Sequence, residues 1–243
     1  MKTCAAIWTT ISLLAAPVAA AECRDTQFEG VSLTYCEADP ARDTLRLFLR
    51  DAEGDVLGTF DNLAAAAEPA TVAWAMNGGM YHTDRRPVGL YIEDGVELAP
   101  IVTREGPGNF GLLPNGVLCL AGGRASVVES RRFATERPDC TFATQSGPML
   151  VIDGALHPRF LEDSDSLNVR NGVGVTSSGL LIAAISNEPV NFHRFGRFFR
   201  DVLKTPNALF LDGTISRLYA PELNRHDFGF PMGPMLGVVT AGD

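Results

Sequence analysis

Hydrophobic and polar positions alternate over short stretches along much of the chain. The segments "VSLTYCEA" (31–38) and "TLRLFLRD" (44–51) are typical of strands, because apolar residues recur at alternate positions or run together between turn residues. Four further strand pairs are predicted around turn signals at Asp94–Gly95, Asn115–Gly116, Asp153–Gly154 and Ser177–Gly179. The segment "NALFLDGTISRLY" (207–219) predicts a buried strand, a turn and a second strand.

Two segments favour helices instead. The first is a short helix over 61–69, capped by Asp61 and ended before Pro69. The second runs over 187–205, with Asn187 as its cap and Pro189 in its first turn. Its helical spacing predicts a buried stripe of Phe192, Phe195, Phe199 and Val202, with Arg194, Arg197 and Arg200 elsewhere on its surface.

Together these patterns predict an α+β fold. We expect a single β-rich domain with a mixed or antiparallel sheet and one main amphipathic helix packed on it. No repeat of 20–50 residues and no low-complexity linker divides the sequence after its first residues.

The first residues resemble a targeting segment. Lys2 precedes the apolar stretch 5–20, and Ala19 to Ala21 provide a small-residue cleavage site before Glu22. The stretch is shorter than the roughly 20 apolar residues of a membrane helix, and no later segment could span a bilayer. We therefore expect a signal peptide over 1–21, a mature domain over 22–243, no membrane anchor, and export to the periplasm or secretion.

Export would place the cysteines in an oxidising compartment. Without Cys4 four remain, an even number that favours two disulfides, and they can pair in three ways. We favour Cys23–Cys36 with Cys119–Cys140, because each pair closes a local loop; each bond would stabilise the fold by about 2–4 kcal/mol. A metal site is the alternative, but CxxC spacing is absent and no histidine lies nearby in the sequence.

Charge narrows the classes of partner. The formal net charge is −9, and loss of Lys2 leaves 29 acidic against 19 basic residues, about −10. A nucleic-acid-binding protein is expected to be basic, so we expect no nucleic-acid partner. An acidic protein can still bind an anion through a local basic site.

Small and polar residues gather at the ends of several predicted strands. These clusters are Asn77–Gly79, Gln145–Gly147, Arg170–Gly172 and Asp212–Thr214. Glycine turns allow main-chain N–H groups to approach a ligand, and a concave array of such groups suits an anion. Each cluster alone is also typical of hairpin geometry, whereas four of them together favour a shared pocket.

Arg170 is the best candidate to hold an anion, since its planar fork can donate two hydrogen bonds to a phosphate. A salt bridge to Asp163 or Asp165 is the alternative use of that side chain. Arg197 is a second candidate, although a solvated helix face also accounts for it.

Two carboxylates are candidates for acid–base chemistry. Asp212 directly follows an apolar strand, where partial desolvation would raise its pKa and suit it to proton donation; it could also cap its own turn. Glu188 is the possible second carboxylate, and its alternative role is to interact with the dipole of the helix that follows.

Other reaction classes find less support. The four histidines lack HxH or HExxH spacing, so no zinc site is predicted, and His82 is the most interesting of them because it follows two glycines. The GxSxG pattern of serine hydrolases is absent, which leaves Ser146 as a minor alternative nucleophile that would need a histidine partner. There is no P-loop or dinucleotide fingerprint, and we predict no cofactor.

Eight short motifs occur in an order that resembles a known family. They are "MNGGMY", "PVGLYIEDG", "NFGLLPNGV", "ATQSGPMLVIDG", "RNGVGV", "PVNFHRFGRFFRD", "NALFLDGTIS" and "GPMLGVV". Each is weak alone, but together they resemble the phosphodiester glycosidase family from about Phe28 to Val239. Its members include the lysosomal enzyme that removes N-acetylglucosamine from a phosphodiester-linked mannose tag.

This resemblance implies hydrolysis of a sugar-1-phosphodiester, in which water attacks the anomeric carbon. Asn77–Gly79, Arg170 and Asp212–Gly213 match motifs of the family. Thr214 departs from a second glycine found in many members, while Ser216 is retained. With Asp212 and Glu188 as catalytic carboxylates, the expected substrate-binding residues are Asn77, Gly78, Gly79, His82, Gln145, Ser146, Arg170, Asn171, Gly213, Thr214 and Ser216.

The expected partner is therefore a sugar phosphate or glycan. A non-catalytic protein that binds an anionic glycan or an envelope polymer is the alternative. It would keep Arg170 and the glycine turns but would need no buried carboxylate.

Overall fold

The computed structural model describes residues 21–213 and 215–241. The predicted signal peptide, apart from Ala21, lies outside these residues, as does Thr214. Within the described part of the chain, no helix is long and apolar enough to cross a membrane.

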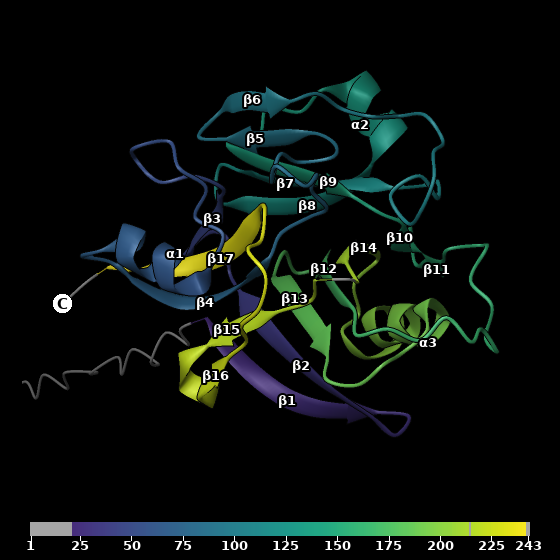
Figure 1. The fold of residues 1–243 in the computed structure, drawn as a ribbon. Helices are drawn as coiled ribbons and strands as arrows, with labels where there is room; N and C mark the ends of the chain where they lie inside the picture. Colours follow the sequence, from purple (N-terminus) through teal and green to yellow (C-terminus); the bar gives the residue numbers. More distant parts are fainter. Residues whose placement is uncertain (1–20, 214, 242–243) are drawn as a thin grey trace, which may run out of the picture.

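Three sheets form the body of the molecule, and their strands pair in antiparallel fashion (Figure 1). The first has seven strands, in the order β1 (Glu22–Phe28), β2 (Val31–Ala38), β13 (Leu181–Ser186), β12 (Asn171–Val175), β14 (Asn207–Asp212), β10 (Met149–Ile152) and β11 (Ala155–Leu156). The second contains β16 (Arg225–His226), β15 (Leu218–Ala220), β4 (Thr71–Asn77), β17 (Met235–Thr240) and β3 (Thr44–Phe48). The third contains β6 (Val96–Ala99), β5 (Tyr91–Glu93), β9 (Phe142–Ser146), β7 (Gly116–Ala121) and β8 (Arg124–Glu129).

One core is shared by all three sheets. Its buried side chains include Leu209 and Leu211 of β14, Trp74 of β4 and Leu118 of β7. The protein is thus predominantly β, with few helices; antiparallel pairing is as expected, but three sheets replace the single one predicted. The three-sheet arrangement brings strand ends from different sheets together, which positions the candidate site described below.

Three of the four predicted turns join paired strands. Asp94–Gly95 connects β5 to β6, Asp153–Gly154 connects β10 to β11, and Ser177–Gly179 lies between β12 and β13. The prediction at Asn115–Gly116 is wrong, because the β7–β8 hairpin turns at Gly122–Gly123. Both of these glycines have positive φ, which suits a tight turn better than Asn115, whose buried amide donates to Phe110.

The short helices differ from the sequence prediction at their ends. Helix α1 spans Phe60–Ala67 and is capped by Thr59, whose Oγ1 accepts a hydrogen bond from the Asn62 N–H, rather than by Asp61. Helix α2 (Ser130–Glu136) was not predicted. Its N-terminal carboxylate Glu129 accepts a hydrogen bond from the Arg132 N–H, so a capping residue is present even though the segment is short.

The main helix is shorter than predicted and changes its winding. Helix α3 spans Phe192–Arg197 with Asn191, not Asn187, as its cap, and a π-helical turn follows over Phe198–Val202. Phe195 and Phe199 are buried as expected, but Val202 is 45% exposed. The wider π turn rotates the later positions, so that Phe198 and Leu203 fill the interface with the first sheet instead.

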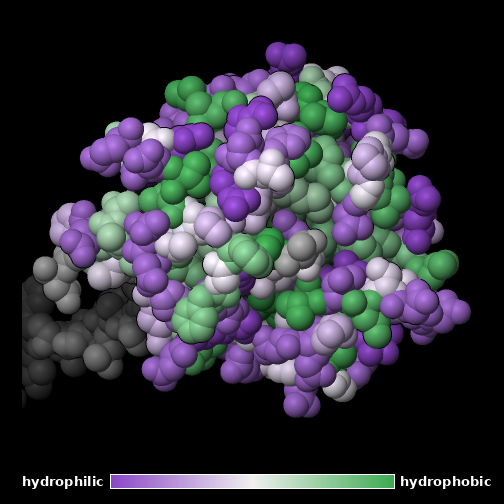
Figure 2. Space-filling view, viewed as in Figure 1, coloured by the Kyte–Doolittle hydropathy of each residue, from purple (hydrophilic) through white to green (hydrophobic). Residues whose placement is uncertain are grey.

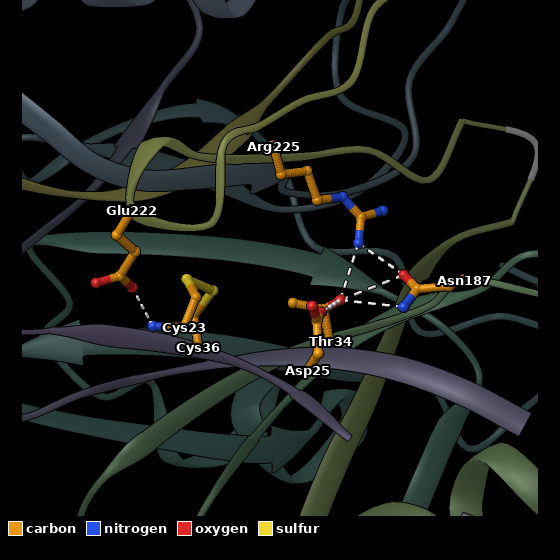
Figure 3. Close-up of a disulfide and its surroundings, with 7 residues drawn as sticks. All are labelled: Cys23, Asp25, Thr34, Cys36, Asn187, Glu222 and Arg225. Carbon is orange, nitrogen blue, oxygen red and sulfur yellow. Dashed lines mark hydrogen bonds between the residues drawn. A yellow bond between two sulfur atoms is a disulfide. The ribbon is translucent and has the colours of Figure 1, made fainter. Parts of the chain in front are cut away.

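Both favoured disulfides are confirmed. Cys23–Cys36 bridges β1 and β2, and Cys119–Cys140 ties β7 to the segment before β9. Figure 3 shows the first bridge beside a polar cluster that connects the β1–β2 hairpin to the second sheet. There Arg225 of β16 donates to Thr34 Oγ1 (2.9 Å) and Asn187 Oδ1 (2.6 Å), and the Cys23 N–H donates to Glu222. These hydrogen bonds therefore attach the β1–β2 hairpin to the segment around β16.

Candidate functional site

The candidate site lies where the three sheets meet, at the ends of β4, β9 and β14 and the start of β12. Asn171 of β12 pairs with Asp212 of β14, and Ser146 Oγ at the end of β9 donates to the Leu211 carbonyl on β14 (2.7 Å). Thr144 Oγ1 of β9 donates to the Gly78 carbonyl just after β4 (2.9 Å). These contacts bring residues of all four predicted clusters together, and we call this region the sheet junction.

Two buried amides, Asn77 and Asn171, link the second sheet to the first. Each donates to the side-chain oxygen of the other (3.1 and 3.2 Å), and Asn171 also donates to the Asn77 carbonyl (3.0 Å). Asn171 Oδ1 accepts from the Asp212 N–H (3.0 Å), while Asn77 Oδ1 accepts from the Arg217 N–H (2.9 Å). Both side chains are fully buried. Their hydrogen bonds therefore help to position the segment from Asp212 to Arg217, and the substrate contact expected of both residues stays a prediction.

The two glycines after Asn77 allow neighbouring strands to pack closely against the main chain. The Gly78 N–H donates to the Pro234 carbonyl (2.7 Å), so it is already engaged within the protein. A Cβ at Gly78 would lie 2.9 Å from main-chain atoms of Met235 and Leu236, and one at Gly79 would lie 2.7 Å from Thr144 Oγ1. Glycine is required at position 78 because β17 of the same sheet packs directly against it, and at position 79 because β9 of the third sheet approaches closely. The expected main-chain donation by Gly78 to an anion is corrected accordingly.

Gln145 and Ser146 are buried and hydrogen-bond within the protein, and the substrate contact expected of them stays a prediction. Gln145 Oε1 accepts from the main-chain N–H groups of Leu90 and Val102 (3.0 and 2.9 Å), and its Nε2 donates to Val102 (2.6 Å) and Ser130 (2.9 Å). Ser146 is inaccessible and donates to Leu211. Within the described residues no histidine hydrogen-bonds Ser146, so the serine nucleophile lacks the partner it needs.

Arg170 is buried on the other side of the 212–217 turn, with 1% of its surface exposed. Its Nε donates to the Val190 carbonyl (2.7 Å), its Nη2 donates to the Ser166 carbonyl (2.8 Å), and its guanidinium lies 3.6 Å from the centroid of the Phe192 ring. Burial lowers its pKa to about 10. These contacts engage Nε and Nη2 within the protein, and the phosphate contact expected of Arg170 stays a prediction. No ion pair with Asp163 or Asp165 is found among the described residues.

Asp212 occupies the accessible edge of the junction. It is half-buried at the end of β14, and Oδ1 accepts a hydrogen bond from the Ile215 N–H (3.4 Å). Ser216 Oγ donates to the Asp212 carbonyl (2.6 Å) and to Val169 (3.2 Å). Gly213 lies beside the Phe210 ring, where a Cβ would come within 3.0 Å. The turn thus holds a carboxylate at the surface, with its main chain fixed by buried partners.

The other two predicted polar residues lie outside this network. Glu188 is exposed on the loop after β13, before the cap of α3, so it is not in the first turn of the helix. No hydrogen bond or ion pair among the described residues connects Glu188 to Asp212. His82 is exposed in the turn after Tyr81, where its N–H donates to the Arg86 carbonyl (2.8 Å).

Three residues that form a group around Tyr81 were not predicted from the sequence: Tyr81 itself, Arg85 and Arg217. Burial and the charge of Asp212 raise the pKa of the Tyr81 phenol, while Arg85 and Arg217 oppose that shift. The Arg85 guanidinium lies 5.3 Å from the centroid of the Tyr81 ring. The available signals were weak: Tyr81 ends "MNGGMY", and Arg217 directly follows Ser216.

The loop over 227–234 borders this group of side chains. Tyr81 Oη donates to the Pro231 carbonyl (3.2 Å), and Arg217 Nη1 donates to the Phe230 carbonyl (2.6 Å). Phe228 and Phe230 are 84% and 78% exposed. Elsewhere, hydrophobic residues on the face in Figure 2 form small groups between hydrophilic ones. The loop therefore presents aromatic side chains next to the polar site.

Two large cavities lie away from the junction. One of about 610 Å³ lies between the β5–β6 hairpin and α2, and another of about 750 Å³ lies between α1, β4 and β15. Among the described residues, no group of three His, Cys, Asp or Glu side chains is arranged to hold a metal ion.

Comparison with solved structures supports the fold. The zebrafish N-acetylglucosamine-1-phosphodiester alpha-N-acetylglucosaminidase catalytic domain, auto-inhibited by its pro-peptide, is 16% identical with a TM-score of 0.63, over 92% of this chain and 85% of that one. A putative exported protein from Burkholderia pseudomallei K96243 is 12% identical with a TM-score of 0.58, over 86% and 74% of the two chains.

Comparison of sequences is more specific. Uncharacterized protein YigE of Escherichia coli (strain K12) is 35% identical over 182 residues, which cover 74% of this chain and 71% of the relative. Residues 70–239 match the phosphodiester glycosidase family, and this range contains the junction residues of β4, β9, β12 and β14. Since the match spans more than half of the sequence, the protein belongs to the phosphodiester glycosidase family.

Proposed function

We propose that this protein is an exported hydrolase that cleaves the bond between a sugar and a phosphodiester, with Asp212 as its catalytic carboxylate. Family membership supports the reaction class, and the zebrafish relative is named for an N-acetylglucosamine-1-phosphodiester substrate. The observation that carries the proposal is the half-buried Asp212 at the sheet junction, whose main chain is fixed by the buried amide of Asn171.

The chemistry needs one group that manages a proton. Water attacks the anomeric carbon, its oxygen becomes the new sugar hydroxyl, and the bond from that carbon to the phosphate oxygen breaks. The electron pair of the broken bond stays on the leaving phosphate, and Asp212 accepts the proton from water. A phosphate monoester is already a good leaving group, so a single carboxylate suffices and Glu188 has no assigned step.

Export is part of the same proposal. Two disulfides are typical of an oxidising compartment, and the sequence begins with a segment that resembles a signal peptide. Fractionation of cells that produce the full chain, followed by mass determination of the exported product, tests it. A cytoplasmic protein that retains residues 1–21 would contradict this location.

The activity is tested with a panel of sugar-1-phosphodiesters that includes an N-acetylglucosamine member. We expect sugar release by the native protein and a loss of about 10²-fold or more in kcat/KM for Asp212→Asn, because the amide cannot accept the proton. Glu188→Gln is the matched control and should retain activity. Equal activity of Asp212→Asn and the native protein would remove Asp212 from the mechanism. Sugar binding without release would favour the non-catalytic glycan-binding alternative.

A further inference from the structure

Arg85 and Arg217 are both partly exposed, in a protein whose formal charge is −9. Among the described residues neither arginine has a salt bridge, although many arginines elsewhere do, for example Arg197 with Glu29 (2.8 Å) and Arg225 with Asp227 (2.9 Å). A cation kept near a surface without a carboxylate partner can attract an anion.

Main-chain contacts fix the position of Arg217. Its N–H donates to Asn77 Oδ1, and its Nη1 donates to the Phe230 carbonyl in the bordering loop. A side chain at Gly229 would overlap the guanidinium, so the loop closes around it. Among its contacts with described residues, the guanidinium donates this one hydrogen bond, although the group carries five N–H donors. The remaining donors are held in place and can meet a ligand.

Tyr81 connects the two arginines to each other. Its Oη and the Arg217 guanidinium bond to the carbonyls of consecutive residues, Pro231 and Phe230, so the two side chains lie close together. The Arg85 guanidinium faces the ring of the same tyrosine. Asp212 is connected to this group through the two buried amides, since its N–H donates to Asn171 Oδ1 and the Arg217 N–H donates to Asn77 Oδ1. The charge of Asp212 also raises the pKa of the Tyr81 phenol.

We propose that Arg217 and Arg85, with Tyr81 between them, bind the phosphate of the substrate, and that this anion site replaces the one predicted at Arg170. The proposal rests on the proposed function and identifies where the charged half of the substrate lies. A phosphate held there would place the neighbouring anomeric carbon toward Asp212. The charge of the phosphate grows from about −1 to −2 as it leaves, so two cations stabilise the departing group more than the bound substrate.

Binding can be measured separately from catalysis. Isothermal titration of the full chain with inorganic phosphate and with N-acetylglucosamine 1-phosphate should give millimolar or tighter dissociation constants. Arg217→Gln and Arg85→Gln should each weaken both by about tenfold or more, because each removes charge-assisted hydrogen bonds. Arg124→Gln, an exposed arginine on β8 far from the junction in sequence, is the matched control and should bind like the native protein.

Additional variants separate charge from loop structure. Arg217→Lys keeps the charge and should recover part of the affinity lost in Arg217→Gln. Among the described residues, Arg85 makes no hydrogen bond to the 227–234 loop, so Arg85→Gln removes the cation without breaking a hydrogen bond to that loop. Circular dichroism and thermal unfolding identify any variant whose fold has changed.

The outcomes distinguish this inference from the proposed activity. Native-like phosphate binding by both glutamine variants, or no binding by the native protein at millimolar phosphate, would overturn the anion site. If the native protein still released sugar and Asp212→Asn did not, the proposed hydrolysis would stand without it. Conversely, phosphate binding that depends on both arginines, with no sugar released from any substrate, would support the anion site and contradict the hydrolysis.

Discussion

The 212–217 turn has arginines on two unlike sides. On one side Arg170 is buried against Phe192 and donates to two main-chain carbonyls. On the other side Arg217 is partly exposed and donates to one carbonyl, with Arg85 nearby across Tyr81. The same guanidinium group thus organises the protein on one side and is available to a ligand on the other. Burial and the pairing of donors, rather than residue type, decide which role an arginine has.

The largest expected effect is the loss of folding stability when Arg170 is replaced. Arg170→Leu should lower the free energy of unfolding by about 3 kcal/mol, because the carbonyls of Val190 and Ser166 lose their donors inside the protein. Arg217→Gln should cost about 1 kcal/mol or less, since water can replace its single bond. Urea unfolding of both variants measures the difference. Similar losses for the two would show that the sides are not distinct.

A smaller loss of stability is expected when Asn171 is replaced, because its side chain accepts a hydrogen bond from the Asp212 N–H. Asn171→Ala should cost about 2 kcal/mol in urea unfolding, because the amide bridges Asn77 and the Asp212 N–H in a buried position. Sugar release should fall as well, through the displaced carboxylate. The control Asn109→Ala, at an exposed position, should stay within about 0.5 kcal/mol of the native protein. Unchanged stability and activity for Asn171→Ala would argue against a positioning role.

The smallest effect is expected on the pKa of the Tyr81 phenol, which responds to the charges of Asp212, Arg85 and Arg217. Burial and Asp212 raise its pKa above the usual 10.0. Asp212→Asn should therefore lower this pKa, and Arg217→Gln should raise it, in a titration followed by ring ¹³C NMR and assigned with Tyr81→Phe. Changes of the opposite sign in either variant would contradict the arrangement.

The raised pKa of Tyr81 also predicts how the folding stability changes with pH. Because the folded-state pKa of Tyr81 is the higher one, its contribution is fully present below the unfolded value near 10 and is lost as pH rises through the folded value. Tyr81→Phe should therefore show less loss of stability than the native protein when urea unfolding is repeated at increasing alkaline pH. An identical loss in both proteins would show that the phenol does not contribute.

Local features of the fold could be predicted from neighbouring residues. The hairpins at Asp94–Gly95 and Asp153–Gly154 follow from turn chemistry, and the disulfide Cys23–Cys36 closes a short loop between adjacent strands. The main helix was harder to predict, because its π turn depends on packing against the first sheet, which turned Val202 outward and Phe198 inward. The helix caps also differ from those predicted, since the hydrogen bonds that begin the two helices are accepted by Thr59 and Asn191.

For the candidate site, the sequence predicted correctly that several residues lie close together, but it did not predict the hydrogen bonds that they make inside the protein. Asn77, Asn171 and Asp212 do lie together, yet Asn77 and Asn171 are buried supports, and Gly78 makes room for another strand instead of a ligand. Tyr81 and Arg217 were missed, because only their contacts with the 227–234 loop bring them together.

By itself the sequence predicted the abundance of strands, several turns and a resemblance to one family, since these depend on short-range patterns or on motif order. It also favoured the correct one of three possible cysteine pairings. Only the tertiary structure decided that three sheets meet at Asp212, that Arg170 is enclosed and that Arg217 remains accessible. Burial and hydrogen-bond partners are contributed by residues far apart in the chain, and a linear pattern does not contain those distances.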